Sequence, residues 1–387
     1  MKKVFISLIG LFLTVLLSNE VLHIVNYKNQ QYIWGWANEA TRDAGLNKPL
    51  FLLDKELIYV PNKNVFSLPD KTLLYDSLGF RPTGAKYSGP DAIDIVVLGD
   101  SFTYGFLLDL NETLPYLLER YLRNLGWKTN VYNAGVNGYG SDQQFLYLKK
   151  RILNSVQPDI VIWNININDL EDNNSACLFK KTRNGFEHVP AWLNTSYIQG
   201  RLIQILPDRI VDSRLGNVIL HGIAPGWSRH TIGCTRKIPP EGQYDHLQDE
   251  KIVYLLEQFS ELSIKYRFKL YLSLAPSQFY IDKSYPHDHF MVKMYQNLKS
   301  TLEKSGMPLL DTNSVLVSLI SSVAYQGRFT GNIVQNLRGV LGTTVSNIDI
   351  SLEKLFIDEG ELARGNWHPT AVTNSIIADY YAHTLTL

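Results

Sequence analysis

The chain has 387 residues, and 45% of them are hydrophobic, which is enough for a substantial core and argues against wholesale disorder. Lys and Arg together number 37, as do Asp and Glu, so the formal net charge is zero. This balance, together with the lack of a dense basic patch in the sequence, argues against a nucleic-acid partner.

The first 25 residues differ from the rest of the chain. Lys2 and Lys3 precede an apolar run over residues 4–17, which is the form of an export signal. No small-x-small cleavage site follows, and extending the run to Val25 gives a plausible membrane-spanning length. We therefore expect residues 1–25 to form an uncleaved membrane anchor, rather than a cleaved signal or a buried soluble helix. The positive-inside rule then predicts a membrane-anchored or secreted protein whose remainder lies outside the cytoplasm.

Residues 26–90 are expected to form a lead-in segment of irregular structure, because turn residues separate its short apolar pieces. From Ile93 onward, buried strands alternate with amphipathic helices. The expected strands cover residues 93–98, 129–132, 158–165, 268–276 and 308–311. The expected helices cover residues 114–125 with Thr113 as N-cap, 141–154 opened by a capping box at Ser141, 246–264, 288–305, and a last helix after Pro369.

Strands that alternate with helices of this length predict an α/β fold, a three-layer α/β/α sandwich around a mostly parallel sheet. The pattern lapses between about residues 175 and 240, which we interpret as an insertion. The predicted organisation is therefore an anchor over residues 1–25, a lead-in over 26–90 and one large domain over 91–387 that contains the insertion.

Unusual polar loops follow three of the predicted strands: Gly99-Asp100-Ser101, residues 133–140 and residues 166–169. Functional groups of open parallel sheets collect at the carboxyl ends of the strands. A serine at such a turn can act as a nucleophile if a base reaches it. Gly and Asn on neighbouring loops can donate hydrogen bonds to the oxyanion that then develops.

In their order along the chain, these motifs resemble the sequence blocks of the SGNH hydrolases, also called the GDSL family. The resemblance covers roughly residues 55–387 apart from the insertion, and it implies the flavodoxin-like α/β/α fold of that family. "GDSFTYG" resembles the first block, which implies that Ser101 is the nucleophile and that its own N–H is an oxyanion donor. "NAGVNGYGSDQ" resembles the second block and implies that Gly138 is a backbone donor.

The remaining blocks complete the resemblance. "NININDLEDN" resembles the third block and implies that Asn168 is a side-chain donor, although the block lacks its usual Gly. "NWHPTA" resembles the last block and implies that His368 is the base. In the lead-in, "YVPN" and "LGFR" resemble the leaders of membrane-associated bacterial members.

The last block departs from the family pattern, because Asn366 and Gly365 stand where the family carries an Asp. In a serine protease triad, Asn in place of that Asp costs about 10⁴ in rate, because the amide can favour the wrong imidazole tautomer. Several alternatives remain open at this stage. Asn366 can offer its side-chain carbonyl oxygen to the imidazole, or a nearby acidic residue, Asp358, Glu359 or Glu361, can supply the carboxylate. Otherwise the site works as a Ser-His dyad, or it is inactive.

The resemblance favours a serine esterase that needs no metal or organic cofactor and acts on an ester-bearing small molecule, lipid or envelope glycan. Two alternatives remain: a polysaccharide O-acyltransferase that forms the same acyl-enzyme beside a membrane acyl-donor partner, and an inactive carbohydrate-binding protein. Cys177 and Cys234 form either a disulfide or two unpaired thiols, and their spacing matches no zinc pattern.

Overall fold

In a computed structural model of the chain, the structure describes residues 45–67, 71–205, 246–282, 285–326, 355–357 and 368–385. Several predictions from the sequence therefore lie outside the described residues, namely the anchor over residues 1–25, Asn366, the acidic residues Asp358, Glu359 and Glu361, and Cys234. Cys177 is disulfide-bonded. Within the described ranges, no helix is long and apolar enough to cross a membrane.

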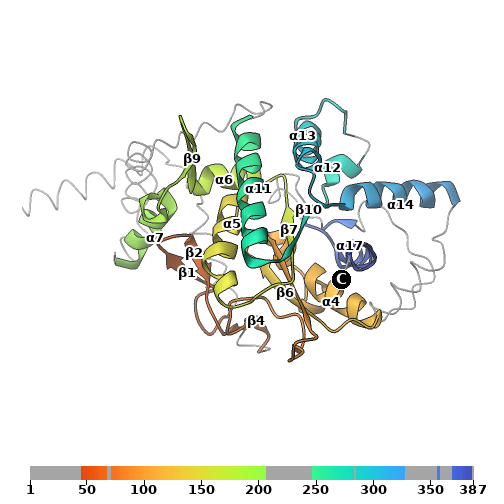
Figure 1. The fold of residues 1–387 in the computed structure, drawn as a ribbon, viewed down its shortest axis with the longest axis horizontal. Helices are drawn as coiled ribbons and strands as arrows, with labels where there is room; N and C mark the ends of the chain where they lie inside the picture. Colours follow the sequence, from red (N-terminus) through yellow and green to blue (C-terminus); the bar gives the residue numbers. More distant parts are fainter. Residues whose placement is uncertain are drawn as a thin grey trace, which may run out of the picture.

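The centre of the fold is a five-stranded sheet whose neighbouring strands are all parallel (Figure 1). From one edge to the other its strands are β11 (Leu309–Asp311), β10 (Lys269–Leu274), β7 (Ile160–Ile165), β5 (Ile93–Gly99) and β6 (Thr129–Gly135). Every expected strand of the sheet is present, and β6 runs on to Gly135 instead of ending at Tyr132. Numbered along the chain, the spatial order is the 2-1-3-4-5 order of flavodoxin-like sheets, with a switch point between β5 and β7.

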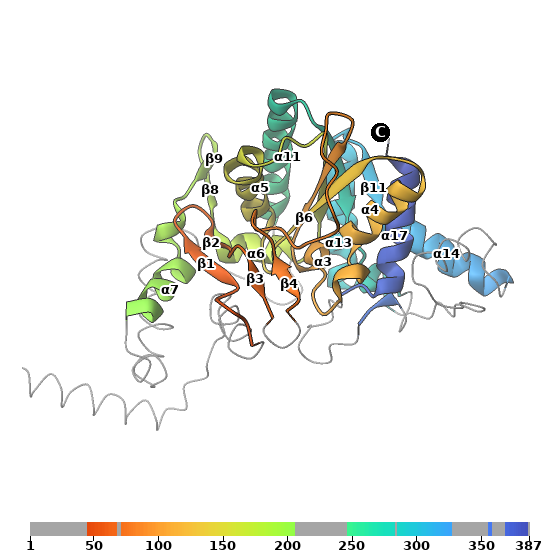
Figure 2. The same ribbon diagram turned by 90° about the horizontal axis from the view of Figure 1, so that it is seen from below.

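Helices cover both faces of this sheet, which confirms the predicted three-layer α/β/α class (Figures 1 and 2). One face carries α4 (Leu114–Asn124) and α17 (Ala371–Thr384), and the other carries α5 (Ser141–Lys150), α11 (His246–Tyr266) and α13 (Phe290–Lys304). Along β5, Ile95 and Val97 face α4 and α17, whereas Val96 and Leu98 face α5 and α11. Because both faces are buried there, residues 95–98 of the strand form a continuous apolar run.

Shorter elements connect and flank these layers. They are α3 (Ser101–Tyr104), α6 (Asp169–Ala176), α12 (Gln278–Ile281), α14 (Thr312–Gln326) and the 3₁₀ turns Leu110–Glu112, Ile152–Asn154 and Ala191–Leu193. The described part of the insertion contains a hairpin of β8 (Phe179–Thr182) and β9 (Gly185–His188), followed by α7 (Thr195–Ile205). In Figure 2, α7 lies beside β1 and β2 of the lead-in.

Two expected helix starts differ in detail from the structure. Thr113 is the N-cap residue of α4 as expected, but its hydroxyl donates to the Leu110 carbonyl at 3.0 Å and makes no capping hydrogen bond to the helix. The capping box expected at Ser141 is wrong, because Gly140 is the N-cap of α5 and Ser141 is its first residue. The reason is tertiary, since Ser141 Oγ donates at 2.8 Å to Oδ2 of Asp169, the first residue of α6.

The described part of the lead-in contains two antiparallel ribbons, so the expectation of irregular structure was wrong there. β1 (Phe51–Asp54) pairs with β2 (Ile58–Pro61), and β3 (Val65–Phe66) pairs with β4 (Leu73–Tyr75). Phe51, Tyr59 and Tyr75 of these strands are buried in the core that also holds α5. The lead-in gains its regular structure from this burial, which is not visible in its local sequence pattern.

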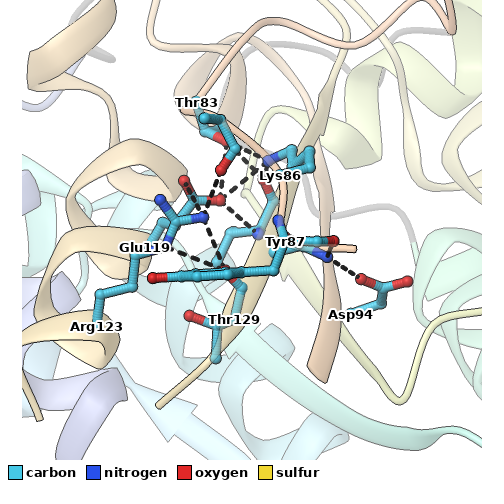
Figure 3. Close-up of polar contacts among 10 residues, drawn as sticks. Thr83, Lys86, Tyr87, Asp94, Glu119, Arg123 and Thr129 are labelled. Atoms are coloured by element: carbon cyan, nitrogen blue, oxygen red, sulfur yellow. Dashed lines mark hydrogen bonds and ion pairs between the residues drawn. The ribbon is translucent and has the colours of Figure 1, made fainter. Parts of the chain in front are cut away.

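A buried ion-pair cluster fastens the end of the lead-in to α4 and β6 (Figure 3). The Glu119 carboxylate on α4 pairs with Lys86 and Arg123, each at 3.0 Å, and the Glu119 side chain is only 3% exposed. Its Oε2 also accepts hydrogen bonds from the Thr83 hydroxyl at 3.2 Å and the Val131 N–H at 2.8 Å. Arg123 and Lys86 are only partly exposed, so this carboxylate is more important to the fold than an ion pair on the surface would be.

We expect Glu119→Gln to lower the free energy of unfolding by about 1–3 kcal/mol, because it leaves two partly buried cations without their shared anion. Urea denaturation of the full-length protein measures this change. Asp91→Asn is the matched control, because Asp91 is 81% exposed and pairs with Lys128 at 3.7 Å. The free energy of unfolding of the control should be close to that of the wild type. An equal loss of unfolding free energy in the two variants would contradict the role given to Glu119.

Candidate active site

The three loops expected to form the site lie at one edge of the sheet, where β5, β6 and β7 end. β5 and β6 are in register up to the pair Gly99 and Gly135, and the Val136 N–H donates to the Gly99 carbonyl at 3.1 Å. β7 lies on the other side of β5. The loops therefore flank the switch point between β5 and β7, which is where open α/β sheets bind ligands.

Ser101 is the first residue of α3, directly after the end of β5. The turn is very tight, since a Cβ atom at Gly99 would lie 2.2 Å from Thr103 Oγ1. A Cβ atom at Gly135 would likewise lie 2.2 Å from the Tyr104 nitrogen. Glycine at the ends of β5 and β6 thus allows α3 to sit directly on the strands, with Ser101 at the edge of the sheet.

The structure brings His368 to Ser101, although 267 positions separate them in the chain. His368 Nε2 lies 2.8 Å from Ser101 Oγ. The His368 carbonyl accepts a hydrogen bond from Ile357 N–H at 2.8 Å. The centroid of the imidazole ring lies 4.6 Å from that of Phe102 and 5.3 Å from that of Phe106. His368 is therefore held both by its backbone and by its ring.

Asn168 reaches the site from the loop after β7, where it precedes α6. Its Nδ2 donates to Asp100 Oδ2 at 2.9 Å, and Asp100 Oδ1 accepts from Phe102 N–H at 2.9 Å. An amide nitrogen carries two hydrogens, so this bond fixes the plane of the Asn168 amide and uses one of its two donors. The Asp100 carboxylate is fully buried and links the turn at Ser101 to the loop at Asn168.

Gly138 lies in the loop between β6 and α5. Its φ angle is +74°, in the left-handed region that favours glycine. Among the backbone hydrogen bonds of the described residues, none uses the Gly138 N–H. The structure thus brings the four predicted site residues Ser101, Gly138, Asn168 and His368 to one edge of the sheet, whereas Asn366 lies outside the described residues.

Two buried carboxyl groups next to the site share an unusual environment. Burial raises the pKa of Asp100, while hydrogen bonds from Asn168 and Phe102 and the charge of His368 act in the opposite direction. Burial raises the pKa of Asp169 well above its usual range, and the charge of Asp100 raises it further. Because Asp100 receives a donor on each oxygen, Asp169 is the member of the pair that holds a proton more strongly.

Sequence reasoning missed the residue that fastens the far end of α3. Arg81 is 6% exposed, and its guanidinium donates to the carbonyls of Tyr104 at 2.7 Å, Gly105 at 2.6 Å and Leu108 at 2.6 Å. These bonds hold the loop that contains Phe106, which packs on His368. Arg81 belongs to the "LGFR" motif, and an arginine in an otherwise apolar stretch was the signal in the sequence that could have drawn attention to it.

Residues 97–268 match the sequence model of the GDSL-like lipase/acylhydrolase family. This match agrees with the resemblance to the SGNH hydrolases that the sequence motifs indicated. The match includes Ser101, Gly138 and Asn168 and ends before His368. None of the curated proteins matches the chain in sequence.

Solved structures similar to the chain include an acetyl xylan esterase, AlAXEase, with 13% identity and a TM-score of 0.38, over 76% of this chain and 100% of that one. LAE5, an alpha/beta hydrolase from the metagenome of Lake Arreo in Spain, has 12% identity and a TM-score of 0.39, over 76% and 97%. A member of the lipolytic G-D-S-L family from Veillonella parvula has 10% identity and a TM-score of 0.34, over 76% and 98%.

Asp169→Asn is expected to stabilise the protein at neutral pH and to change it little in acid. Because the folded-state pKa of Asp169 is raised above its ordinary value of 3.8, its stabilising contribution is full below that pH and is lost as the pH rises through the folded-state pKa. Asn cannot ionise, so thermal unfolding between about pH 4 and pH 8 should show a difference from the wild type that grows with pH. Asp91→Asn, at an exposed carboxylate, should show no such growth. A constant difference for Asp169→Asn across the pH range would rule out the assigned protonation.

Proposed function

We propose that the chain is a serine esterase in which Ser101 is the nucleophile and His368 the general base. The observation that carries this proposal is the 2.8 Å hydrogen bond between Ser101 Oγ and His368 Nε2, in a chain whose residues 97–268 match the GDSL-like lipase/acylhydrolase family. A nucleophile within hydrogen-bond reach of its base is the arrangement that activates a serine hydroxyl.

Ser101 Oγ attacks the carbonyl carbon of an ester while His368 Nε2 takes the hydroxyl proton. The tetrahedral intermediate then expels the alcohol, which leaves with that proton, and the acyl group stays on Ser101. Water attacks this acyl-enzyme, gives its proton to His368 and releases the acid, and the proton returns to Ser101. No metal or organic cofactor enters these steps.

The oxyanion of the tetrahedral intermediate has three proposed donors: the N–H groups of Ser101 and Gly138, and Nδ2 of Asn168. Ser101 is the first residue of its helix, so its N–H has no acceptor within the helix. The bond to Asp100 supports the Asn168 role, because it holds the amide in one plane before the reaction begins. Donors fixed in advance stabilise developing charge without having to reorganise.

The Asp100 carboxylate is fully buried, and the charge of His368 acts to lower its pKa, against the effect of burial. We propose that the site works as a Ser-His dyad, in addition to any group that orients the other ring nitrogen. The substrate class remains an ester of a small molecule, a lipid or an envelope glycan.

Treatment of the full-length protein, purified in mild detergent, with a fluorophosphonate should give a single phosphonyl adduct on Ser101, seen by intact mass and peptide mapping. Ser101→Ala should lose the adduct, and His368→Gln should slow labelling by about 10²–10⁴ because the general base is gone. Ser155→Ala, at an exposed serine far along the chain, is the matched control and should label normally. Folded wild type that stays unlabelled, or an adduct that persists in Ser101→Ala, would contradict the proposal.

Hydrolysis of p-nitrophenyl esters of increasing acyl length should continue for many turnovers in water and fall to background in Ser101→Ala. Release of p-nitrophenol measures the rate, and the preferred acyl length measures the size of the acyl site. A burst that stops after one equivalent per chain, and continues only when an oligosaccharide acceptor is added, would instead identify an O-acyltransferase. In both reactions the same acyl-enzyme forms, so the acceptor alone distinguishes them.

A further inference from the structure

The strand β2 of the lead-in lies against the loop that carries Gly138, and Tyr59 makes the contact. The Tyr59 side chain is buried, and its hydroxyl donates to the Asn137 carbonyl at 2.7 Å. In return, the Tyr139 hydroxyl donates to the Tyr59 carbonyl, and the two rings lie 5.2 Å apart between centroids. A third bond joins the same segments, from Gln143 Nε2 to the Leu57 carbonyl at 2.9 Å.

The bond from Tyr59 has a direct consequence for Gly138. The Asn137 carbonyl and the Gly138 N–H belong to one peptide unit, which is planar and trans, so the two groups point in opposite directions. A hydrogen bond that fixes the carbonyl on one side therefore fixes the direction of the N–H on the other side. The remaining freedom of this peptide is rotation of its plane, and the Tyr59 hydroxyl opposes that rotation.

We propose that Tyr59 is a positioning residue of the active site, whose hydroxyl aims the Gly138 N–H at the oxyanion of the bound ester. This inference rests on the proposed function, in which Gly138 is an oxyanion donor, and extends it to the lead-in. Tyr59 lies outside residues 97–268, which match the family. The "YVPN" motif then has a role at the site that its position in the sequence does not suggest.

Three further observations fit this role. Burial raises the pKa of the Tyr59 hydroxyl well above its usual range, so it stays protonated and able to donate at any pH where an esterase works. Hydrogen bonding to the Asn137 carbonyl also polarises the peptide unit and makes its N–H a stronger donor. The residue before Tyr59, the β-branched Ile58, has a φ angle of +73°, a strained conformation that the surrounding contacts must hold.

The test compares Tyr59→Phe with Tyr75→Phe in the full-length protein. Each variant removes one hydroxyl from a fully buried tyrosine of the same core, but among the described residues the Tyr75 hydroxyl has no hydrogen-bond partner. Because removing a whole oxyanion donor costs about 10²–10³ in rate, a donor that has lost its aim should cost roughly tenfold to a hundredfold. We expect the maximal rate of fluorophosphonate labelling at Ser101 to fall by that factor in Tyr59→Phe, with the half-saturating concentration unchanged, and to stay at the wild-type value in Tyr75→Phe.

A second readout follows the Gly138 peptide itself and does not need activity. The dipeptide Asn-Gly occurs twice in the chain, at Asn137-Gly138 and Asn184-Gly185. Labelling with carbonyl-¹³C asparagine and ¹⁵N glycine therefore leaves two amide signals in a carbonyl-filtered NMR spectrum. Tyr59→Phe should shift the Gly138 signal and leave the Gly185 signal in place, whereas Tyr75→Phe should shift neither.

The outcomes separate this inference from the proposed function. Two outcomes would overturn the positioning role and leave the esterase proposal intact. In the first, Tyr59→Phe labels at the wild-type rate and its Gly138 signal does not shift. In the second, Tyr75→Phe slows labelling as much as Tyr59→Phe does. Folded wild type that does not label would overturn the proposed function, and with it the catalytic role of Tyr59. If Tyr59→Phe does not fold, Tyr139→Phe loosens the same contact and should slow labelling and shift Gly138; no effect there would overturn the inference.

Discussion

The buried carboxylate of Asp100 is the contact on which the rest of the site depends. One of its oxygens accepts the Phe102 N–H at the start of α3, and the other accepts the Asn168 amide from the loop after β7. A single side chain therefore sets the turn that presents Ser101 and the plane of the Asn168 amide. Because the carboxylate is fully buried, each of these two hydrogen bonds stabilises a charge that would otherwise be costly. Loss of either bond would therefore weaken the Asp100 carboxylate as a partner for the other.

The described part of the lead-in packs against the rest of the described fold. Its first ribbon reaches the Gly138 loop through Tyr59, Arg81 fastens the loop behind Ser101, and its last residues join the Glu119 cluster at the start of β6. These contacts lie upstream of the part of the chain that matches the family, while His368 lies downstream of it. The site is thus assembled from three separate stretches of the chain, and the sheet supplies the edge at which they meet.

Local sequence patterns succeeded where burial is regular and failed where a distant contact decides the structure. The central strands β5 and β7 were predictable because both of their faces are buried and each contains an uninterrupted apolar run, at residues 95–98 and 160–163. The capping box at Ser141 failed because that hydroxyl has a partner at the start of another helix, Asp169 of α6. The ribbons of the lead-in were missed because their short strands are stabilised by aromatic contacts such as that of Phe51 with Tyr59, rather than by alternation along the strand.

The sequence by itself determined the fold class, the order of the site motifs and the identity of Ser101, Gly138, Asn168 and His368 as candidates, because these depend on residue type and on position at strand ends. Only the tertiary structure decided which of them meet. The 2.8 Å contact of His368 with Ser101, the bond of Asn168 to Asp100 and the bond of Tyr59 to the Gly138 peptide unit all join segments far apart in the chain. Such contacts follow from the packing of the sheet and its helices, and no local pattern of residues encodes them.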